Sequence, residues 1–143
     1  MKKPYRGSCH CGAVTFECQL DFAEGIRRCN CSFCAKTRMQ KSFALRDEFA
    51  ITSGKEALTS YRAVPSNWRE GDVDHYFCNR CGVRPFSRGY LEDFLGHFYA
   101  VNVACLDGVS DEELGTAPII YENGRHDDYE NPPADIRFMG SAA

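Results

Sequence analysis

Clustered cysteines constrain this chain more than any other feature of its sequence. The 143 residues include nine cysteines, and seven of them occur in three short stretches: "SCHCG" (8–12), "RCNCSFC" (28–34) and "FCNRCG" (77–82). An odd number of cysteines, behind a start that has no secretory signal, does not suit a disulfide framework. Two thiolates close in sequence can instead bind the same ion, each sulfur about 2.3 Å from it. The pattern therefore predicts metal sites.

Two of the stretches each supply a cysteine pair that is followed by a glycine. The pairs are Cys9 with Cys11 and Cys78 with Cys81. A glycine after the second thiol relieves crowding in a tight metal-binding turn. Redox dithiols share the Cys-x-x-Cys spacing, but its flanks here resemble strands rather than the strand–helix context of thioredoxin-like motifs. Together the pairs predict one closed, structural four-thiolate zinc site that ties the N-terminal strand to the middle of the chain.

The remaining stretch offers an odd set of thiols. Its three cysteines are Cys29, Cys31 and Cys34. Three thiolates leave a tetrahedral zinc one ligand short, and an open position is what distinguishes a catalytic zinc from a structural one. Spacing alone leaves alternatives: Cys9 or Cys78 could pair with this stretch, and His10 or His75 could supply the fourth ligand. A single zinc beside a loop of free thiols is a further possibility.

The rest of the chain resembles a series of short strands, which predicts one mostly antiparallel all-β domain over residues 1–143. Strands are expected at 13–20, 42–46, 49–54, 57–63, 73–78, 83–90 and 97–106, with a loop at 64–72, one helical turn at 110–115 and an irregular tail from about 116 to 143. The run 97–106 is the longest and is expected to be a buried central strand. Ser110 is the expected N-cap of the helical turn. Cys18 and Cys105 lie in apolar stretches, which predicts small core residues.

Composition and charge narrow the possible partners. Hydrophobic residues make up 43% and charged residues 26% of the chain, and no apolar run approaches the ~20 residues of a membrane span, which predicts a soluble, cytoplasmic protein without membrane contact. Residues 26–46 carry six bases and no acid, whereas 107–135 carry nine acids against Arg125. These segments are either two solvated faces or a positive potential that attracts a small anion. The net charge of −3 argues against nucleic-acid binding.

Four stretches, in their order and spacing, resemble one known family. "RGSCHCGAVTF", "RRCNCSFC", "YFCNRCGV" and "YAVNVACLDG", between about residues 7 and 108, are similar to the glutathione-dependent formaldehyde-activating enzymes, which include centromere protein V-like domains. The resemblance implies an all-β fold like that of Rab accessory zinc-binding domains. It also implies two zinc ions per chain, a structural one on Cys9, Cys11, Cys78 and Cys81 and a catalytic-type one on Cys29, Cys31 and Cys34. The implied reaction joins glutathione and formaldehyde into S-hydroxymethylglutathione, formally a carbon–sulfur lyase activity.

The chemistry of such a site favours a thiol as its ligand. Three thiolates and Zn²⁺ carry a net charge of about −1, so the ion polarises water poorly, but coordination deprotonates an incoming thiol outright. The hypothesis is that a glutathione-like thiol fills the open position and adds to an aldehyde. Candidate carboxylate contacts are Arg27, Arg28, Lys36 and Arg38, which could equally be solvated. Candidate proton donors are His75, His97, Tyr76 and Tyr99, any of which could be core residues, and Trp68 could cover the site or anchor its loop.

Two other function classes fit parts of this pattern. In the first, both zinc ions are structural and the chain is a non-enzymatic module that binds a protein or a nucleic acid. In the second, the three closely spaced thiols serve a redox or metal-storage protein. The missing basic tail and the missing stacking motif count against a nucleic-acid partner.

Overall fold

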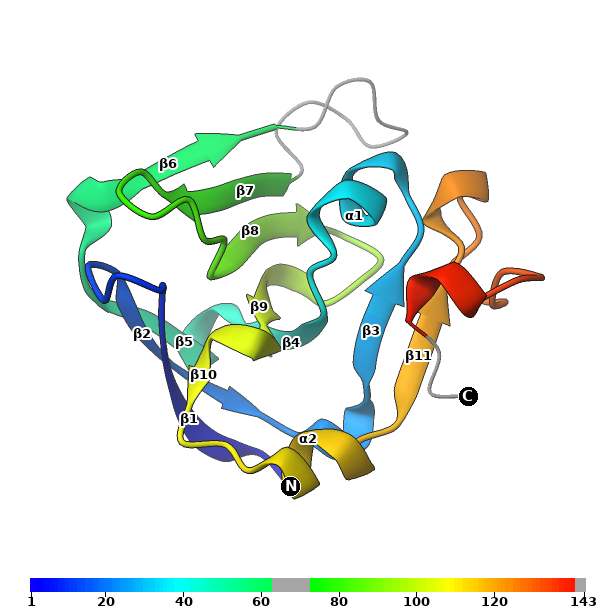
Figure 1. The fold of residues 1–143 in the computed structure, drawn as a ribbon, viewed down its shortest axis with the longest axis horizontal. Helices are drawn as coiled ribbons and strands as arrows, with labels where there is room; N and C mark the ends of the chain where they lie inside the picture. The colour runs from blue at the N-terminus through cyan, green and yellow to red at the C-terminus, as the bar shows by residue number, and fades with distance from the viewer. Residues whose placement is uncertain (63–72, 141–143) are drawn as a thin grey trace.

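The computed structural model describes residues 1–62 and 73–140, and most of its regular secondary structure is strand (Figure 1). One sheet has four strands in the order β10-β1-β2-β5, and the other has seven in the order β11-β3-β4-β9-β8-β7-β6. The bounds are β1 Lys3–Ser8, β2 Thr15–Leu20, β3 Ile26–Cys29, β4 Lys41–Leu45, β5 Phe49–Ser53, β6 Leu58–Tyr61, β7 Val73–Cys78, β8 Phe86–Leu91, β9 Gly96–Asn102, β10 Leu106–Asp107 and β11 Ile119–Glu122. Apart from the parallel pair β3–β11, the paired strands are antiparallel, which confirms the predicted all-β class.

The predicted central strand is confirmed, although it is shorter than expected. β9 lies between β4 and β8 in the middle of the seven-stranded sheet. It ends at Asn102 because the side chain of Asn102 accepts a hydrogen bond from the backbone N–H of Ala104 and so caps a 3-10 turn over Val103–Cys105. β8 likewise begins only at Phe86, because Pro85 has no N–H to donate to the sheet.

Aromatic side chains join the two sheets in one core. Phe16 of β2 and Phe86 of β8 are fully buried, and their ring centroids lie 5.8 Å apart in an edge-on contact. Tyr99 of β9 stacks on Phe49 of β5, with centroids 3.9 Å apart. Apolar positions alternate along β2, which places Phe16, Cys18 and Leu20 inside. Cys18 and Cys105 are both buried, as predicted for core residues.

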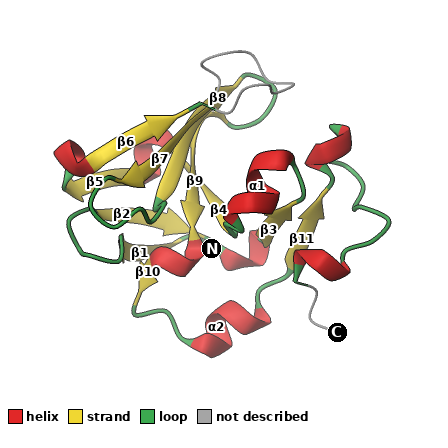
Figure 2. Ribbon diagram, turned by 45° about the horizontal axis from the view of Figure 1, so that its top comes forward, coloured by secondary structure: helices red, strands yellow, loops and turns green. Residues whose placement is uncertain are grey.

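Two short helices lie beside the sheets, α1 (Ser32–Thr37) next to β3 and α2 (Asp111–Thr116) between β10 and β11 (Figure 2). The helical turn predicted at 110–115 is α2, and the hydroxyl of Ser110 caps it by accepting from the N–H of Glu113. Five further 3-10 helices of three residues each lie at Phe22–Glu24, Arg46–Glu48, Lys55–Ala57, Gly124–His126 and Arg137–Met139 in the described part of the chain. Among the described residues, no helix is long and apolar enough to cross a membrane.

Part of the tail expected to be irregular is ordered. β11 lies within 116–143 and pairs with β3, so that Glu122 stands opposite Cys29. Sequence periodicity cannot detect this pairing, because it joins segments far apart in the chain and each is only four residues long. Up to residue 140, the remaining described tail consists of turns, bends and the two short 3-10 helices at its Gly124–His126 and Arg137–Met139 segments. The loop predicted at 64–72 lies outside the described residues.

Candidate metal centres

The first cysteine cluster brings together the two pairs that precede glycines. The Sγ atoms of Cys9, Cys11, Cys78 and Cys81 all lie within 4.8 Å of one another. The Cys9–Cys11 and Cys11–Cys78 sulfurs are each 3.7 Å apart. That separation is too long for a disulfide and close to the about 3.8 Å expected between sulfurs at the corners of a tetrahedron around zinc. The donor set and its spacing therefore fit a four-coordinate metal ion.

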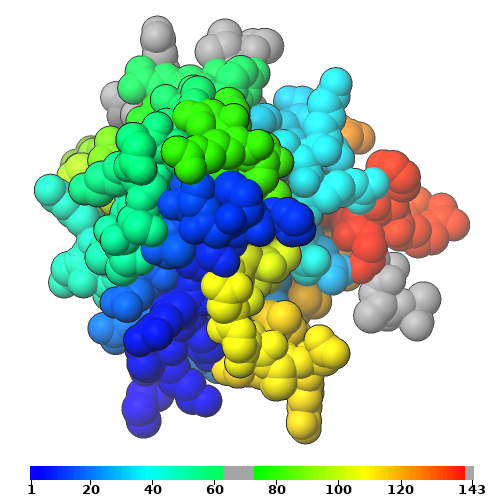
Figure 3. All heavy atoms as spheres, turned by 60° about the vertical axis from the view of Figure 1, so that its left-hand side comes forward, coloured from blue at the N-terminus to red at the C-terminus, as the bar shows by residue number. Residues whose placement is uncertain are grey.

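This cluster joins turns from the two sheets. Cys9 and Cys11 lie in the turn after β1, whereas Cys78 ends β7 and Cys81 lies in the turn that follows it. In Figure 3 these two turns, blue and green, lie against one another on the surface. Backbone N–H groups point at the sulfurs, as from Val14 to Cys9 at 3.3 Å and from Arg80 to Cys78 at 3.4 Å. Backbone hydrogen bonds from Cys11 and Val83 lower the pKa of Cys81 to about 6, which favours the thiolate that a metal requires.

The second cluster is local. Cys29 ends β3, Cys31 is the N-cap of α1 and Cys34 lies in the first turn of α1; their three Sγ atoms also lie within 4.8 Å of one another. The N–H of Cys31 donates to the sulfur of Cys29 at 3.4 Å, and the N–H of Cys34 donates to that of Cys31 at 3.3 Å. Hydrogen bonds from Cys29 and Cys34 lower the pKa of Cys31 to about 2. The hydrogen bond with Cys31 raises the pKa of Cys29, and hydrogen bonds with Cys29 and Cys31 raise that of Cys34, so the negative charge is concentrated on Cys31. The two backbone N–H groups that donate to sulfur suit the loop to thiolates.

The described residues add no fourth metal ligand to this cluster. Neither His10 nor His75 belongs to it, and Cys9 and Cys78 are part of the other one. All nine cysteines lie in the described part of the chain and are free. The arrangement corresponds to one closed set of four thiols and one open set of three.

A cavity of about 730 Å³ opens beside the three-cysteine cluster, and all three cysteines line it. Its walls also carry apolar side chains, among them Phe33, Met39 and Phe98. A cavity of this size and lining is typical of a small-molecule site. The open side of the cysteine cluster thus faces a space that can hold a ligand of tripeptide size.

A buried ion-pair network lies at one wall of the cavity. Nζ of Lys41 is 2.9 Å from Oε1 of Glu122, and Nη1 of Arg27 is 3.2 Å from Oε2 of the same carboxylate. Glu122 is only 4% exposed. Burial disfavours the charged form of Lys41, but the negative charges of Cys34 and Glu122 outweigh it and raise the lysine's pKa. Sequence analysis counted Lys41 only as one of the six bases at 26–46 and Glu122 only as one of the nine acids at 107–135, and it singled out neither. The signal for Glu122 was one acid ending the apolar run "PIIYE".

The basic residues singled out in the sequence have other partners. Arg27 pairs with Glu122, and Arg28 donates to the backbone carbonyl of Gly140 and to Gln40. Nη1 of Arg38 donates to the carbonyl of Phe138 at 2.5 Å, and its guanidinium lies 4.2 Å above the Phe138 ring. The C-terminal segment, red in Figure 3, consequently lies against α1, cyan. Lys36 is exposed on α1 and does not line the cavity.

Only one of the four candidate proton donors lines the cavity. His75 does so, and its Nδ1 is 2.8 Å from Oγ of Ser87. Burial, together with the nearby charge of Arg84, lowers the pKa of His75 to about 4, so the ring is neutral at pH 7. Tyr76 and Tyr99 pack against the core, and His97 is exposed against Tyr90. Trp68 lies outside the described residues.

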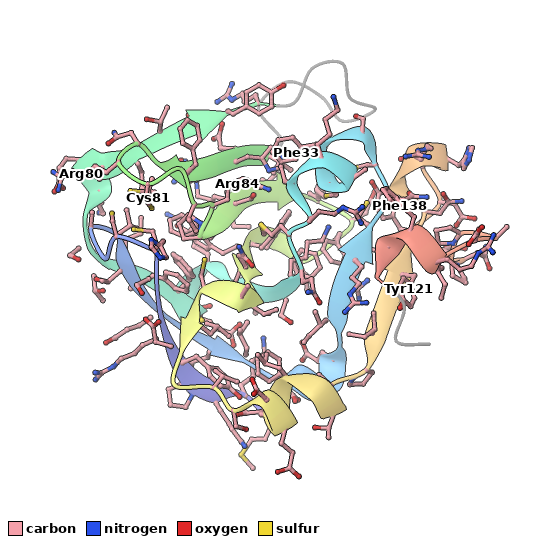
Figure 4. The ribbon with its side chains drawn as sticks, in the orientation of Figure 1. Phe33, Arg80, Cys81, Arg84, Tyr121 and Phe138 are labelled. Atoms are coloured by element: carbon pink, nitrogen blue, oxygen red, sulfur yellow. The ribbon has the colours of Figure 1, made fainter. Side chains whose placement is uncertain are left out.

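Side chains from three elements meet where α1 approaches the seven-stranded sheet. The ring of Phe33 lies 4.1 Å from that of His75 and stacks on Tyr61, with centroids 5.6 Å apart. The guanidinium of Arg84 lies 4.4 Å from the same Phe33 ring (Figure 4). Because Phe33 stands between Cys31 and Cys34, this packing fixes the cysteine loop against β7.

Comparisons with known proteins agree on one family. The family model of the glutathione-dependent formaldehyde-activating enzymes matches residues 4–123, a longer range than the 7–108 expected. A putative glutathione-dependent formaldehyde-activating enzyme of Halomonas elongata is 29% identical over 82 residues, which are 52% of this chain and 50% of that relative. The chain thus matches about half the length of this relative. A crystal structure of a Rhodobacter sphaeroides protein, a structural genomics target, covers 80% of this chain and 98% of its own, with 33% identity and a TM-score of 0.64.

Proposed function

Because this chain belongs to the glutathione-dependent formaldehyde-activating enzyme family, we propose that it joins a thiol such as glutathione to formaldehyde or a related aldehyde. In this proposal it is a carbon–sulfur lyase-type enzyme that needs two zinc ions. Cys9, Cys11, Cys78 and Cys81 hold the structural ion, and Cys29, Cys31 and Cys34 hold the catalytic-type ion. The donor sets fit this assignment, since zinc prefers thiolate ligands and cytosolic structural sites are commonly built from four of them.

One observation carries the proposal: the three-cysteine cluster lines a cavity large enough for a small thiol and an aldehyde together. A zinc ion on these cysteines supplies Lewis acidity that keeps a thiol ligand deprotonated near neutral pH. The chain itself supplies the enclosure and the position of the reactants, which converts a bimolecular addition into a reaction within one complex. A non-enzymatic binding module needs no such cavity beside an open metal-ligand set.

The walls of the cavity contribute a charged network, a positioned histidine and apolar rings. Arg27, Lys41 and Glu122 form a fixed network with a net charge of +1 behind the cysteines, so it adds positive potential without the lysine being free to move. In this proposal His75 exchanges a proton with the nascent hydroxymethyl group; the support is that it lines the cavity, is neutral at pH 7 and is held by Ser87. Phe33 and Phe98 exclude water from part of the cavity.

The test is consumption of formaldehyde with a panel of thiols by the zinc-loaded protein. We expect a rate above the uncatalysed addition that is lost in Cys31→Ala. The matched control is Cys18→Ala, which removes a buried core cysteine that belongs to neither cluster and should keep the rate. No acceleration with any thiol, in protein that contains its metal, would favour the binding-module alternative.

A further inference from the structure

Arg84 is an arginine whose backbone is held rigidly at the cavity wall. It follows the turn of the four-cysteine cluster by three residues, and its carbonyl accepts hydrogen bonds from Nδ2 of Asn102 at 2.9 Å and from Sγ of Cys105 at 3.7 Å. The next residue, Pro85, is fully buried. The side chain of Arg84 lines the same cavity as the three-cysteine cluster. The closed cluster therefore positions a cation next to the open one.

The guanidinium of Arg84 is only partly paired. Its Nη2 lies 3.0 Å from Oγ of Ser87 and 3.1 Å from Nδ1 of His75. Its Nε and Nη1 atoms are buried and have no hydrogen-bond partner in the described part of the chain. The guanidinium face lies over the ring of Phe33, whereas the N–H groups of Nε and Nη1 lie in the guanidinium plane, buried and without an acceptor in the described part of the chain.

No carboxylate in the described part of the chain forms an ion pair with Arg84. The other inner cations of the cavity, Arg27 and Lys41, share Glu122. Burial lowers the pKa of Arg84, and the negative charges of Cys34 and Cys31 oppose this shift, but neither thiol is a hydrogen-bond partner of Nε or Nη1. Buried N–H groups that lack partners cost free energy, and such a cost in a ligand cavity indicates a partner supplied by the ligand. Planar acceptors with two oxygens match a guanidinium best.

We propose that Arg84 binds a carboxylate of the thiol substrate, and that the protein consequently selects thiols that carry a carboxylate. This inference rests on the proposed function for the site of the thiol, but it assigns a different group of the ligand to a different residue. The sequence suggested Arg28, Lys36 and Arg38 for this role. Lys36 does not line this cavity, and Arg28 and Arg38 line a separate, smaller cavity of about 310 Å³ that also touches Cys29 and Cys34, where both donate to backbone carbonyls of the C-terminal segment. Since Nε and Nη1 are shielded, a neighbouring side chain shifts when the carboxylate binds, and the ring of Phe33 can rotate without breaking a hydrogen bond.

The experiment compares 3-mercaptopropionate with 3-mercapto-1-propanol, two thiols of the same length that differ in the carboxylate. Binding to the zinc-loaded protein is measured by calorimetry, without aldehyde. We expect the acid to bind about 10- to 100-fold more tightly than the alcohol, the range for a charge-assisted hydrogen bond in a shielded site. In Arg84→Met the ratio should fall to about one. A wild-type ratio near one, or an unchanged ratio in Arg84→Met, would overturn the inference.

Matched variants separate the effect of the Arg84 charge on binding from an effect of the substitution on the structure. Arg80→Gln removes an exposed arginine from the turn of the four-cysteine cluster. Figure 4 shows Arg80 on the side away from Phe33. In this variant the ratio of the affinities for the acid and the alcohol should equal that of the wild type. Arg84→Gln retains N–H donors but no charge, and takes the place of Arg84→Met if the latter does not fold. Metal content is measured in each protein. Loss of metal in both Arg84 variants would show that Arg84 serves the cysteine cluster instead and would refute the inference.

Turnover with formaldehyde separates this inference from the function on which it rests. If both thiols bind with the expected ratio but neither reacts, the lyase proposal fails and the carboxylate site stands. If both react at similar efficiency and bind equally, the reaction stands and the role of Arg84 is refuted.

Discussion

At the scale of single residues, Glu122 shows how one buried charge organises the wall behind the cysteines. Its carboxylate contacts both Lys41 and Arg27, and register places it opposite Cys29. Removing one member of such a network leaves the remaining charges buried without compensation, which is costly even where the complete network contributes little net stability. The role of Glu122 is thus to keep two cations beside the thiolates at low cost.

Glu122→Gln should therefore destabilise the protein by about 3 kcal/mol, at the low end for a broken buried ion pair because Arg27 retains some solvent contact. Urea unfolding of the metal-loaded protein measures the change. Glu92→Gln, an exposed carboxylate in the turn after β8, is the control and should stay within about 0.5 kcal/mol of the wild type. A loss of unfolding free energy smaller than about 0.5 kcal/mol for Glu122→Gln would mean that solvent reaches the network freely.

A second prediction at the scale of single residues concerns the pKa of His75 and its effect on stability. Burial and Arg84 lower its pKa to about 4 in the folded protein, against about 6.5 in the unfolded chain. Between these values the unfolded chain binds a proton that the folded protein does not, so stability falls as the pH falls. From pH 7 to pH 5 this residue should account for about 2 kcal/mol of the loss.

The comparison of wild type with His75→Gln isolates that contribution, because effects of the thiols and the metal are common to both proteins. Urea unfolding at pH 7 and pH 5 should show a smaller loss in the variant. Equal losses would mean that the folded protein protonates His75 as readily as the unfolded chain does.

At the scale of elements, the turn after β11 closes one side of the three-cysteine loop. A Cβ atom at Gly124 would lie 2.6 Å from Sγ of Cys29 and 3.0 Å from Cβ of Cys31. Gly124→Ala should thus displace the cysteine loop and weaken its metal binding, at a cost of about 1–3 kcal/mol for overpacking. Gly115→Ala is the matched control, since nothing lies within 4 Å of its Cβ position in α2.

Metal content after gel filtration and urea unfolding measure both effects. The expected result for Gly124→Ala is selective loss of metal from the three-cysteine cluster while the four-cysteine cluster keeps its ion. Full metal content in this variant, with wild-type stability, would show that the loop yields to the extra methyl group at no cost.

The same elements show how much of the fold and of the site could be predicted from the sequence. β2, β4, β5 and β7 follow alternating or β-branched runs, and the cysteine clusters follow from spacing, so these could be predicted. β3 could not, because "IRRC" carries two adjacent arginines; nor could α1, whose six residues give no helical periodicity. The ion-pair wall and Arg84 depend on the parallel β3–β11 pairing and on Asn102, which are contacts over long sequence separations. Local patterns contain no information about them.

At the scale of the whole molecule, the two clusters differ in what they connect. The four-cysteine cluster joins the turn after β1 to the turn after β7, and so links the two sheets across 66 residues or more of sequence. The three-cysteine cluster spans six residues at the end of one strand. A metal ion that closes a long loop contributes folding free energy directly, whereas one that closes a short loop adds little order to the chain.

Cys81→Ala and Cys31→Ala should accordingly have different consequences. Loss of a ligand from the closed cluster should leave the sheets unlinked and the protein unfolded or strongly destabilised, since a structural zinc supplies folding free energy outright. Loss of a ligand from the open cluster should remove about one of two ions and leave the fold intact. Circular dichroism, metal analysis and thermal melting of the three proteins measure this, with Cys18→Ala as a control for removing a buried thiol. If Cys31→Ala unfolded as readily as Cys81→Ala, the open cluster would be part of the scaffold. The fourth ligand position of its metal ion could then no longer be assigned to a substrate.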